Sequence, residues 1–263
     1  MTAEQESSTE ILLEESLKSS NTTLDHLQAY YGNDDSFEFF GGCVDAKYLV
    51  STSPNDDNFD FDNGYTGRIQ FAVATADASA NYSSDPNGIE CDNDATGSGV
   101  KPITHPILSN LTIVGTSDGQ IASGGNPTGY LYNGARFRRN TQYTLVNSIV
   151  YGYYYSGVWN NTSNSHRFQD NVVWGISTNF RDFPSGEPDN TNIGVSSASF
   201  LGLTSPFGNY YNSNALRPTS SSPAYSGADF TGLDTSFFDD SIDYKGAVST
   251  SGANWLLLAW IRG

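Results

Sequence analysis

The stretch NDDSFEF at residues 33–39 returns as NDDNFDF at residues 55–61, an offset of 22 residues. The run before it keeps this offset and aligns Leu27 with Leu49, and a further step of 22 would align Phe71 with Leu49. Apolar and polar residues alternate in short runs between Gly, Asn and Asp, which indicates β-strands joined by tight turns. Residue identity that recurs with a period in the low twenties is typical of a parallel β-solenoid, whose rungs stack on one another. A β-sandwich has strands at similar spacing but gives no reason for such a repeat.

A second motif recurs later in the chain, as NLTIVG at 110–115, NSIVYG at 147–152 and DNVVWG at 170–175. The first residue of each copy is Asn110, Asn147 or Asp170, and these residue types tolerate the left-handed backbone of a tight turn. We therefore expect these three residues to stack as a ladder of turns. The pattern predicts an all-β fold built from stacked rungs.

The chain divides into two parts in this interpretation. Residues 1–20 are acidic and carry Ser7 followed by Glu10, a capping box that predicts a short helix, either as a cap on the β-domain or as a tail. Residues 21–263 are expected to form a single β-helix domain with an insertion near 77–88. The loop-rich region 177–240 is expected to cover one side of that domain.

Composition narrows the function classes. The 263 residues include 12 basic and 29 acidic side chains, a net charge of −17, which argues against nucleic-acid partners because phosphate binding needs clustered Lys and Arg. No apolar run approaches the length of a membrane span, so membrane insertion is not expected. Few residues are charged, and Asn, Ser, Thr, Gly and Tyr replace them. This composition favours an extracellular or cell-surface location, although the N-terminus shows no secretory signal.

Three segments resemble a known family: the run from DHLQAYYG at residue 25 onward, ARFRRNTQ at 135–142 and DYKGAVSTSGANW at 243–255. Together with GIECDNDATG at 88–97, they are similar to bacterial secreted and outer-membrane, lipoprotein-type proteins with a pectate-lyase-like fold. The similarity extends over residues 22–260. It implies a right-handed parallel β-helix, here with a short N-terminal capping helix. It implies no shared catalytic set.

Acidic residues alternate with buried aromatic positions in the repeat. If Phe59 and Phe61 face the interior, then the acids between and after them line the outer face, with those of neighbouring rungs about 4.8 Å apart. Carboxylates at this spacing repel one another, and Ca²⁺, which prefers oxygen ligands, would relieve the repulsion. The alternative is a solvated acidic face with Lys47 and Arg68 as counter-charges. The candidate calcium ligands are Asp60, Asp62, Glu90, Asp92 and Asp94.

Aromatic residues gather between residues 151 and 174. Tyr151 and Trp174 share one position of the repeat, so we expect them to pack between rungs. Tyr153, Tyr155 and Trp159 follow the turn at Gly152 and are candidate ligand-binding residues for a polysaccharide or a cell-surface glycan. Such a solenoid could also associate end to end with a second copy through an uncovered rung.

The leading functional expectation is a non-enzymatic extracellular or cell-surface protein that binds glycan or acts in adhesion, with Ca²⁺ as a possible stabilising ion. One alternative is an enzyme of the polysaccharide lyase or glycoside hydrolase type, with Arg68, or Arg136, Arg138 and Arg139, acting near the acids. Another is a structural module of a larger surface assembly. The sequence contains no catalytic signature, so we assign no catalytic residues.

Overall fold

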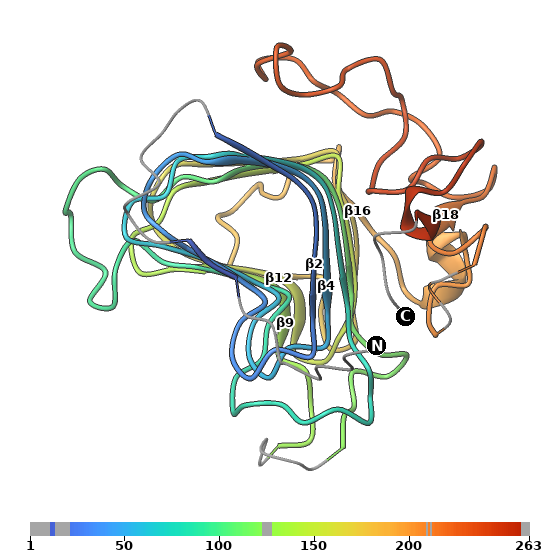
Figure 1. The fold of residues 1–263 in the computed structure, drawn as a ribbon, viewed down its shortest axis with the longest axis horizontal. Helices are drawn as coiled ribbons and strands as arrows, with labels where there is room; N and C mark the ends of the chain where they lie inside the picture. The colour runs from blue at the N-terminus through green and yellow to red at the C-terminus, as the bar shows by residue number, and fades with distance from the viewer. Residues whose placement is uncertain (1–10, 14–21, 123–127, 209, 211, 259–263) are drawn as a thin grey trace, which may run out of the picture.

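The computed structural model describes residues 11–13, 22–122, 128–208, 210 and 212–258, and its regular structure is almost entirely β-strand. Strands from successive rungs pair in parallel and form two long sheets (Figure 1). The chain is therefore a right-handed parallel β-helix, as the repeat and the resemblance predicted. Sheet A contains, in spatial order, β1 (Ile11–Leu13), β3 (Phe37–Phe40), β5 (Phe59–Asp62), β7 (Ile89–Cys91), β9 (Asn133–Arg138), β12 (Ser156–Asn161) and β15 (Phe180–Arg181). Sheet B contains β2 (Thr23–Tyr30), β4 (Asp45–Thr52), β6 (Arg68–Thr75), β8 (Ile107–Val114), β10 (Tyr143–Val146), β11 (Ile149–Tyr153), β13 (His166–Gln169), β14 (Val172–Gly175) and β16 (Ile193–Gly194).

Sheet B turns a sharp corner in each of its long rungs. In β2, β4, β6 and β8 the corner is a single residue with positive φ, and in the later rungs it separates β10 from β11 and β13 from β14. The predicted ladder of Asn110, Asn147 and Asp170 lies at this corner, with φ of 57°, 53° and 59°. Aromatic rings continue the ladder in the first rungs, where Tyr48 stacks 5.1 Å from Phe71.

The predicted register fails by one residue at the third rung. Leu49 pairs with Ala72 rather than with Phe71, which lies instead at the corner position of Tyr48. The turn between β5 and β6 covers residues 63–67, whereas the turn between β3 and β4 covers only 41–44, so the later turn holds one more residue. The repeat of the strands is preserved, and the turn absorbs the difference.

The interior of the coil is filled by stacked side chains. Phe37 stacks on Phe59 at 5.4 Å between ring centroids, and Phe39 stacks on Phe61 at 5.2 Å. All four rings are at most 1% exposed. Aromatic pairs of this kind contribute about 1 kcal/mol each beyond the burial of their area, so the Phe-acid-Phe repeat stabilises the stack while it places the acids outside.

The predicted N-terminal helix is wrong where the structure describes it. Ile11–Leu13 form the strand β1, which pairs in parallel with β3, Ile11 opposite Phe37 and Leu13 opposite Phe39. Without β1, the backbone N–H and C=O groups along the outer edge of β3 would have no strand to pair with. The pairing with Ile11–Leu13 satisfies these groups, so this segment is a strand and not a helix. The other residues of the predicted helix lie outside the described residues.

The C-terminal segment, residues 195–208, 210 and 212–258, runs over the outer face of sheet B (Figure 1). It contains η2 (Ala198–Leu201), β17 (Leu203–Thr204), β18 (Arg217–Pro218) and η3 (Trp255–Leu257). Its side chains form a second apolar cluster with outward-facing residues of sheet B such as Val73, Val114 and Tyr151. The Asn147 side chain binds the backbone of Asp229 in both directions, accepting from its N–H at 2.9 Å and donating to its carbonyl at 3.0 Å. Within the described part of the chain, no helix has the combination of length and apolar character that a membrane span requires.

Candidate functional site

The outer face of sheet A carries the predicted acidic ladder, and the register confirms that its acids stack. Glu38 pairs with Asp60, and Asp60 pairs with Glu90. The ladder then changes character, because the next outward position after Glu90 is Arg136. The complete column, in order along the coil, is Glu38, Asp60, Glu90, Arg136, Trp159 and Arg181.

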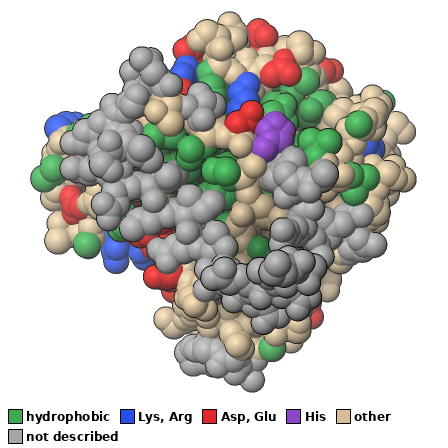
Figure 2. Space-filling model, viewed as in Figure 1, with side chains coloured by type: hydrophobic (Ala, Val, Ile, Leu, Met, Phe, Trp, Pro, Cys, Tyr) green, Lys and Arg blue, Asp and Glu red, His purple; other side chains and the backbone are tan. Residues whose placement is uncertain are grey.

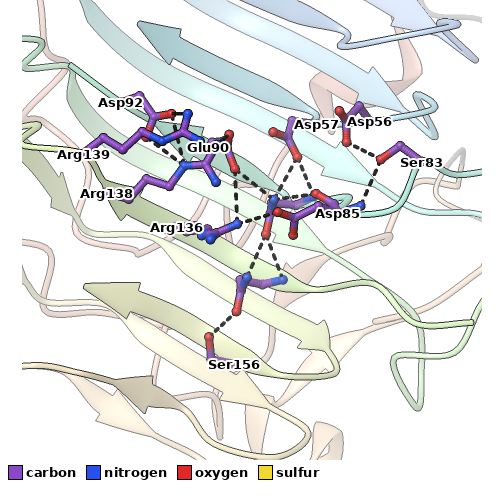
Figure 3. A network of polar contacts seen from close by, with 12 residues as sticks. Asp56, Asp57, Ser83, Asp85, Glu90, Asp92, Arg136, Arg138, Arg139 and Ser156 are labelled. Atoms are coloured by element: carbon purple, nitrogen blue, oxygen red, sulfur yellow. Dashed lines mark hydrogen bonds and ion pairs between the residues drawn. The ribbon is translucent and has the colours of Figure 1, made fainter. Parts of the chain in front are cut away.

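Arginines neutralise the later acids of this face (Figure 3). Arg138 donates from Nε to both carboxylate oxygens of Asp92, at 2.9 and 3.1 Å, and its Nη2 contacts Glu90. Arg139 reaches Asp92 at 2.8 Å. Burial alone would lower the pKa of Arg138, but the charges of Glu90 and Asp92 outweigh it and raise that pKa. Burial raises the pKa of Glu90 to about 7, although Arg138 and Arg136 oppose the rise.

The counter-charges considered from the sequence lie elsewhere. Arg68 pairs with Asp45 and with Asp234 of the C-terminal segment, and its guanidinium lies 4.7 Å from the ring of Phe237. Lys47 lies over the same ring at 4.8 Å. These two residues therefore attach the C-terminal segment to sheet B.

The five candidate calcium ligands do not converge on one point. Glu90 and Asp92 face arginines. Asp94 lies in an exposed turn, where hydrogen bonds from Ser98 and Thr96 lower its pKa. Within the described part of the chain, two groups of three carboxylates lie close enough to share an ion: Asp34, Asp35 and Asp56, and Asp35, Glu38 and Asp60. Of the predicted calcium ligands, only Asp60 belongs to these groups, so calcium binding remains a prediction. The carboxylates best placed to share an ion lie at the N-terminal end of the acidic ladder.

A second column of polar side chains runs parallel to the acids, at the turn that enters sheet A. The side-chain oxygen of each member accepts a hydrogen bond from the backbone N–H of the next member. Asp35 accepts from Asp57 at 2.8 Å, Asp57 accepts from Asn87 at 2.6 Å, and Asn87 accepts from Asn133 at 3.2 Å. The column ends where the Ser156 hydroxyl donates to Asn133 at 2.7 Å (Figure 3). Asp57 is 4% exposed, and burial raises its pKa well above the usual value. Two carboxyl groups thus occupy positions that amides fill in the later rungs.

A groove opens beside the arginine end of the acidic ladder, and we call it the charged groove. Its volume is about 280 Å³, and it is lined by Asp85, Tyr132, Asn133, Arg136, Tyr155, Trp159 and Arg181. The Arg136 and Arg181 guanidinium groups lie 4.5 and 3.8 Å from the Trp159 ring centroid. Arg136 also binds Asp85 at 2.5 Å. The groove therefore combines aromatic surface, two cationic side chains and one carboxylate.

The structure places the three predicted ligand-binding residues in different environments. Tyr155 and Trp159 line the charged groove. Tyr153 is 1% exposed and its hydroxyl points to Asn58 inside the coil, so it cannot reach a surface ligand. The reason is a register shift between Tyr151 and Tyr153, which turns Tyr153 inward.

Sequence reasoning missed Tyr132 and Arg181 as members of this site. Tyr132 precedes β9 and makes an edge contact with Tyr155 at 4.8 Å. Arg181 lies two rungs after Arg136 in the same column. The signal that could have found it is the spacing from Trp159, since 22 residues separate Trp159 from Arg181.

A protein-family model described as a pectate-lyase like β-helix domain matches residues 18–204, which is more than half of the chain. The chain therefore belongs to the family of pectate-lyase-like β-helix domains. No curated protein and no solved structure matches the chain. The family match covers the rungs from β2 onward and the charged groove, and it ends shortly after the C-terminal segment begins.

Proposed function

We propose that this protein binds glycan at the cell surface or outside the cell, without catalysing a reaction, and that the charged groove is its binding site. The observation that carries the proposal is that Tyr155, Tyr132 and Trp159, each of them half-buried, line one groove beside two arginines. Aromatic surface packs against the apolar face of a sugar ring, and guanidinium groups bind carboxylates in a planar fork. A glycan that contains uronate sugars fits this combination best.

The charge distribution of the outer face of sheet A supports this assignment. The acids nearest to the groove are already paired, because Asp85 binds Arg136 and Glu90 binds Arg138. Arg181 has an exposed side chain, 41% accessible, and its nearest acid, Asp182, is 3.8 Å away. It is therefore the arginine of the groove that is best able to exchange its present partner for a ligand carboxylate.

Binding experiments with matched variants test the proposal. A glycan array that includes uronate and neutral polysaccharides would be probed with the wild-type protein and with Tyr155→Ala and Arg181→Ala. We expect uronate binding that both variants weaken by about tenfold or more. Tyr225→Ala is the control, since Tyr225 is 43% exposed on the C-terminal segment, away from the groove residues. Retention of full binding by both groove variants would refute this site.

One observation favours an enzyme as the second candidate. Arg136 faces two carboxylates, Asp85 at 2.5 Å and Glu90 at 3.7 Å, and a Glu90 pKa near 7 suits a general acid. Against this, the raised pKa of Arg138 opposes its use as a base. Release of reducing ends or of unsaturated uronate products, lost in Glu90→Gln, would establish the enzyme and refute the non-enzymatic proposal.

A further inference from the structure

A second groove lies at the carboxyl ends of the sheet B strands, and we call it the aromatic groove. Its volume is about 410 Å³, which is in the range of pockets that hold small molecules. The first rung and the C-terminal segment, which are far apart in the sequence, both contribute to its lining. Its aromatic and charged lining residues are Tyr30, Tyr31, Asp77, Phe207 and Tyr210.

Two tyrosine rings meet at an angle at the start of the groove, where β2 ends. The ring centroids of Tyr30 and Tyr31 are 4.6 Å apart, and the ring planes are inclined by 62°. Consecutive side chains of a regular strand point to opposite faces, but Tyr31 has a φ of 52°, which turns the chain sharply after β2. Tyr30 is 41% exposed, so packing within the protein leaves much of its ring free for a ligand.

A third ring, that of Phe207, comes from the C-terminal segment and is held by contacts with sheet B. It packs edge-on against Tyr151, with 5.3 Å between the ring centroids. The Tyr151 hydroxyl also donates a hydrogen bond to the carbonyl oxygen of Pro206 at 2.5 Å, which fixes the backbone beside the ring. The ring is therefore positioned before a ligand arrives, and this lowers the entropy cost of binding.

The groove carries one negative charge and no positive one. Among the described residues that line it, Asp77 is the one charged side chain. Its carboxylate accepts hydrogen bonds from the Tyr31 hydroxyl at 2.6 Å and from the Ser79 N–H and hydroxyl at 2.8 Å each, and its own N–H donates to the Ser53 hydroxyl at 2.8 Å. The hydrogen bond from Tyr31 is the main cause that lowers the Asp77 pKa, so this carboxylate is ionised at neutral pH. A ligand meets a fixed negative charge that no lining cation offsets.

Aromatic rings beside a single carboxylate favour an organic cation over a metal ion. Ca²⁺ takes about six to eight oxygen ligands, and Asp77 belongs to neither group of carboxylates that lie close enough to share an ion. The face of an aromatic ring attracts a cation within about 6 Å of its centroid, and such rings surround quaternary ammonium groups in known binding sites. The net charge of −17 adds a long-range attraction for any cation.

We propose that the aromatic groove binds a small quaternary ammonium ion, with its methyl groups against Tyr30, Tyr31 and Phe207 and its charge beside Asp77. The same ammonium group occurs in free choline and in phosphocholine head groups. A phosphate would find no cation among the described lining residues, so the ligand is the free ammonium compound. This site goes beyond the proposed glycan site, because the aromatic groove and the charged groove share no lining residue.

Titration calorimetry with choline, with phosphocholine and with the uncharged carbon analogue of choline tests the proposal. The analogue has a carbon atom in place of the nitrogen, so it keeps the shape of the ligand and removes its charge. We expect choline to bind about tenfold more tightly than the analogue, and to lose about tenfold in affinity in Tyr30→Ala and in Asp77→Asn. Tyr225→Ala and Asp240→Asn are the matched controls, because both residues are exposed and neither lines the groove.

The outcomes separate this proposal from the function proposed for the charged groove. Weaker choline binding in Tyr30→Ala and Asp77→Asn, with normal binding in Tyr155→Ala and in both controls, supports the ammonium site. The absence of choline binding at millimolar concentration overturns it, as does equal binding of the uncharged analogue. Tighter binding of phosphocholine than of choline, or full choline binding by both groove variants, also overturns it. None of these results changes the prediction for uronate binding by the charged groove.

Discussion

Replacement of Asp35 by Asn should stabilise the protein at neutral and alkaline pH and leave it nearly unchanged near pH 4. Asp35 is 8% exposed and begins the polar column by accepting a hydrogen bond from the backbone of Asp57. Burial raises its pKa to about 8, and the hydrogen bond from Asp57 only partly opposes the rise. The side chains of Asp34, Asp56 and Glu38 add like charge around it.

The sign follows from the raised pKa. A carboxyl group that holds its proton more tightly in the folded than in the unfolded chain contributes stability below the unfolded pKa, and this stability is lost as pH rises toward the folded pKa. Between pH 3.8 and pH 7 the loss has an upper limit of about 4 kcal/mol, at about 1.4 kcal/mol per pH unit. Asp57 and Asp60 compete for the same protons, so we expect roughly half of this, about 2 kcal/mol. Asparagine removes the loss, since its oxygen still accepts from Asp57 and its amide donates to nearby carboxylates.

The assay is thermal or urea unfolding at pH 4, 5.5, 7 and 8 in EDTA, so that bound cations do not mask the effect. For a chain of 263 residues, 2 kcal/mol corresponds to a rise in Tm of roughly 5 °C at pH 7 to 8. Asp240→Asn is the control, because Asp240 is exposed. A Tm difference that does not change with pH, or an Asp35→Asn protein less stable than wild type at pH 8, would refute the reasoning.

Three further predictions concern the charges, the packing and the calcium site. Arg138→Met leaves Glu90 and Asp92 without their main partner, so urea titrations at pH 7 should show a free energy of unfolding lower by about 3 kcal/mol. Arg139 is more exposed, so Arg139→Met should lower it by less than about 1 kcal/mol in the same titrations. Gly115→Ala should destabilise the protein by several kcal/mol or prevent folding, because a Cβ at this position would lie 2.1 Å from the carbonyl oxygen of Gly152 on the next rung. Gly99 has open space around it, so Gly99→Ala should leave Tm within about 1 °C of the wild type. Equal Tm values for the two variants would contradict the close approach of the rungs. If Ca²⁺ binds at the N-terminal end of the acidic ladder, millimolar Ca²⁺ should raise the Tm of the wild type but not that of Asp35→Asn. The absence of any Tm shift of the wild type in low-salt buffer would refute a calcium site there.

The sequence predicted the acidic side of the candidate site well, because that side depends on a short repeat. Glu38 and Asp60 lie 22 residues apart in nearly identical strands, and alternation fixes which side chains face outward. The arginine side was harder to predict. Arg136 follows Glu90 in the column but lies 46 residues later, so the long excursion between β7 and β9 hides the register.

Two errors share a physical cause, which is that pairing between strands overrides local pattern. The capping-box signal before Ile11 is local, while the pairing of Ile11–Leu13 with β3 depends on a strand edge that no nearby residue reveals. The sequence predicts Tyr153 as a surface residue because it follows the turn at Gly152, but a shift in the pairing with β14 turns its side chain into the core. The acidic face, by contrast, needed only the strand period and the rung period.

The C-terminal segment also bears on how this β-helix can change in length during evolution. Trp255 packs against Tyr48 at 5.4 Å, near the start of the coil, while Lys245 lies 3.9 Å from Asp170, four rungs further on. Duplication of one rung between these points would move the two contacts about 4.8 Å further apart, so the chain between Lys245 and Trp255 would have to follow a more extended path. The two contacts are therefore matched to the present number of rungs between them, and we expect a gain or loss of rungs in this span to be accompanied by a rearrangement of the C-terminal segment.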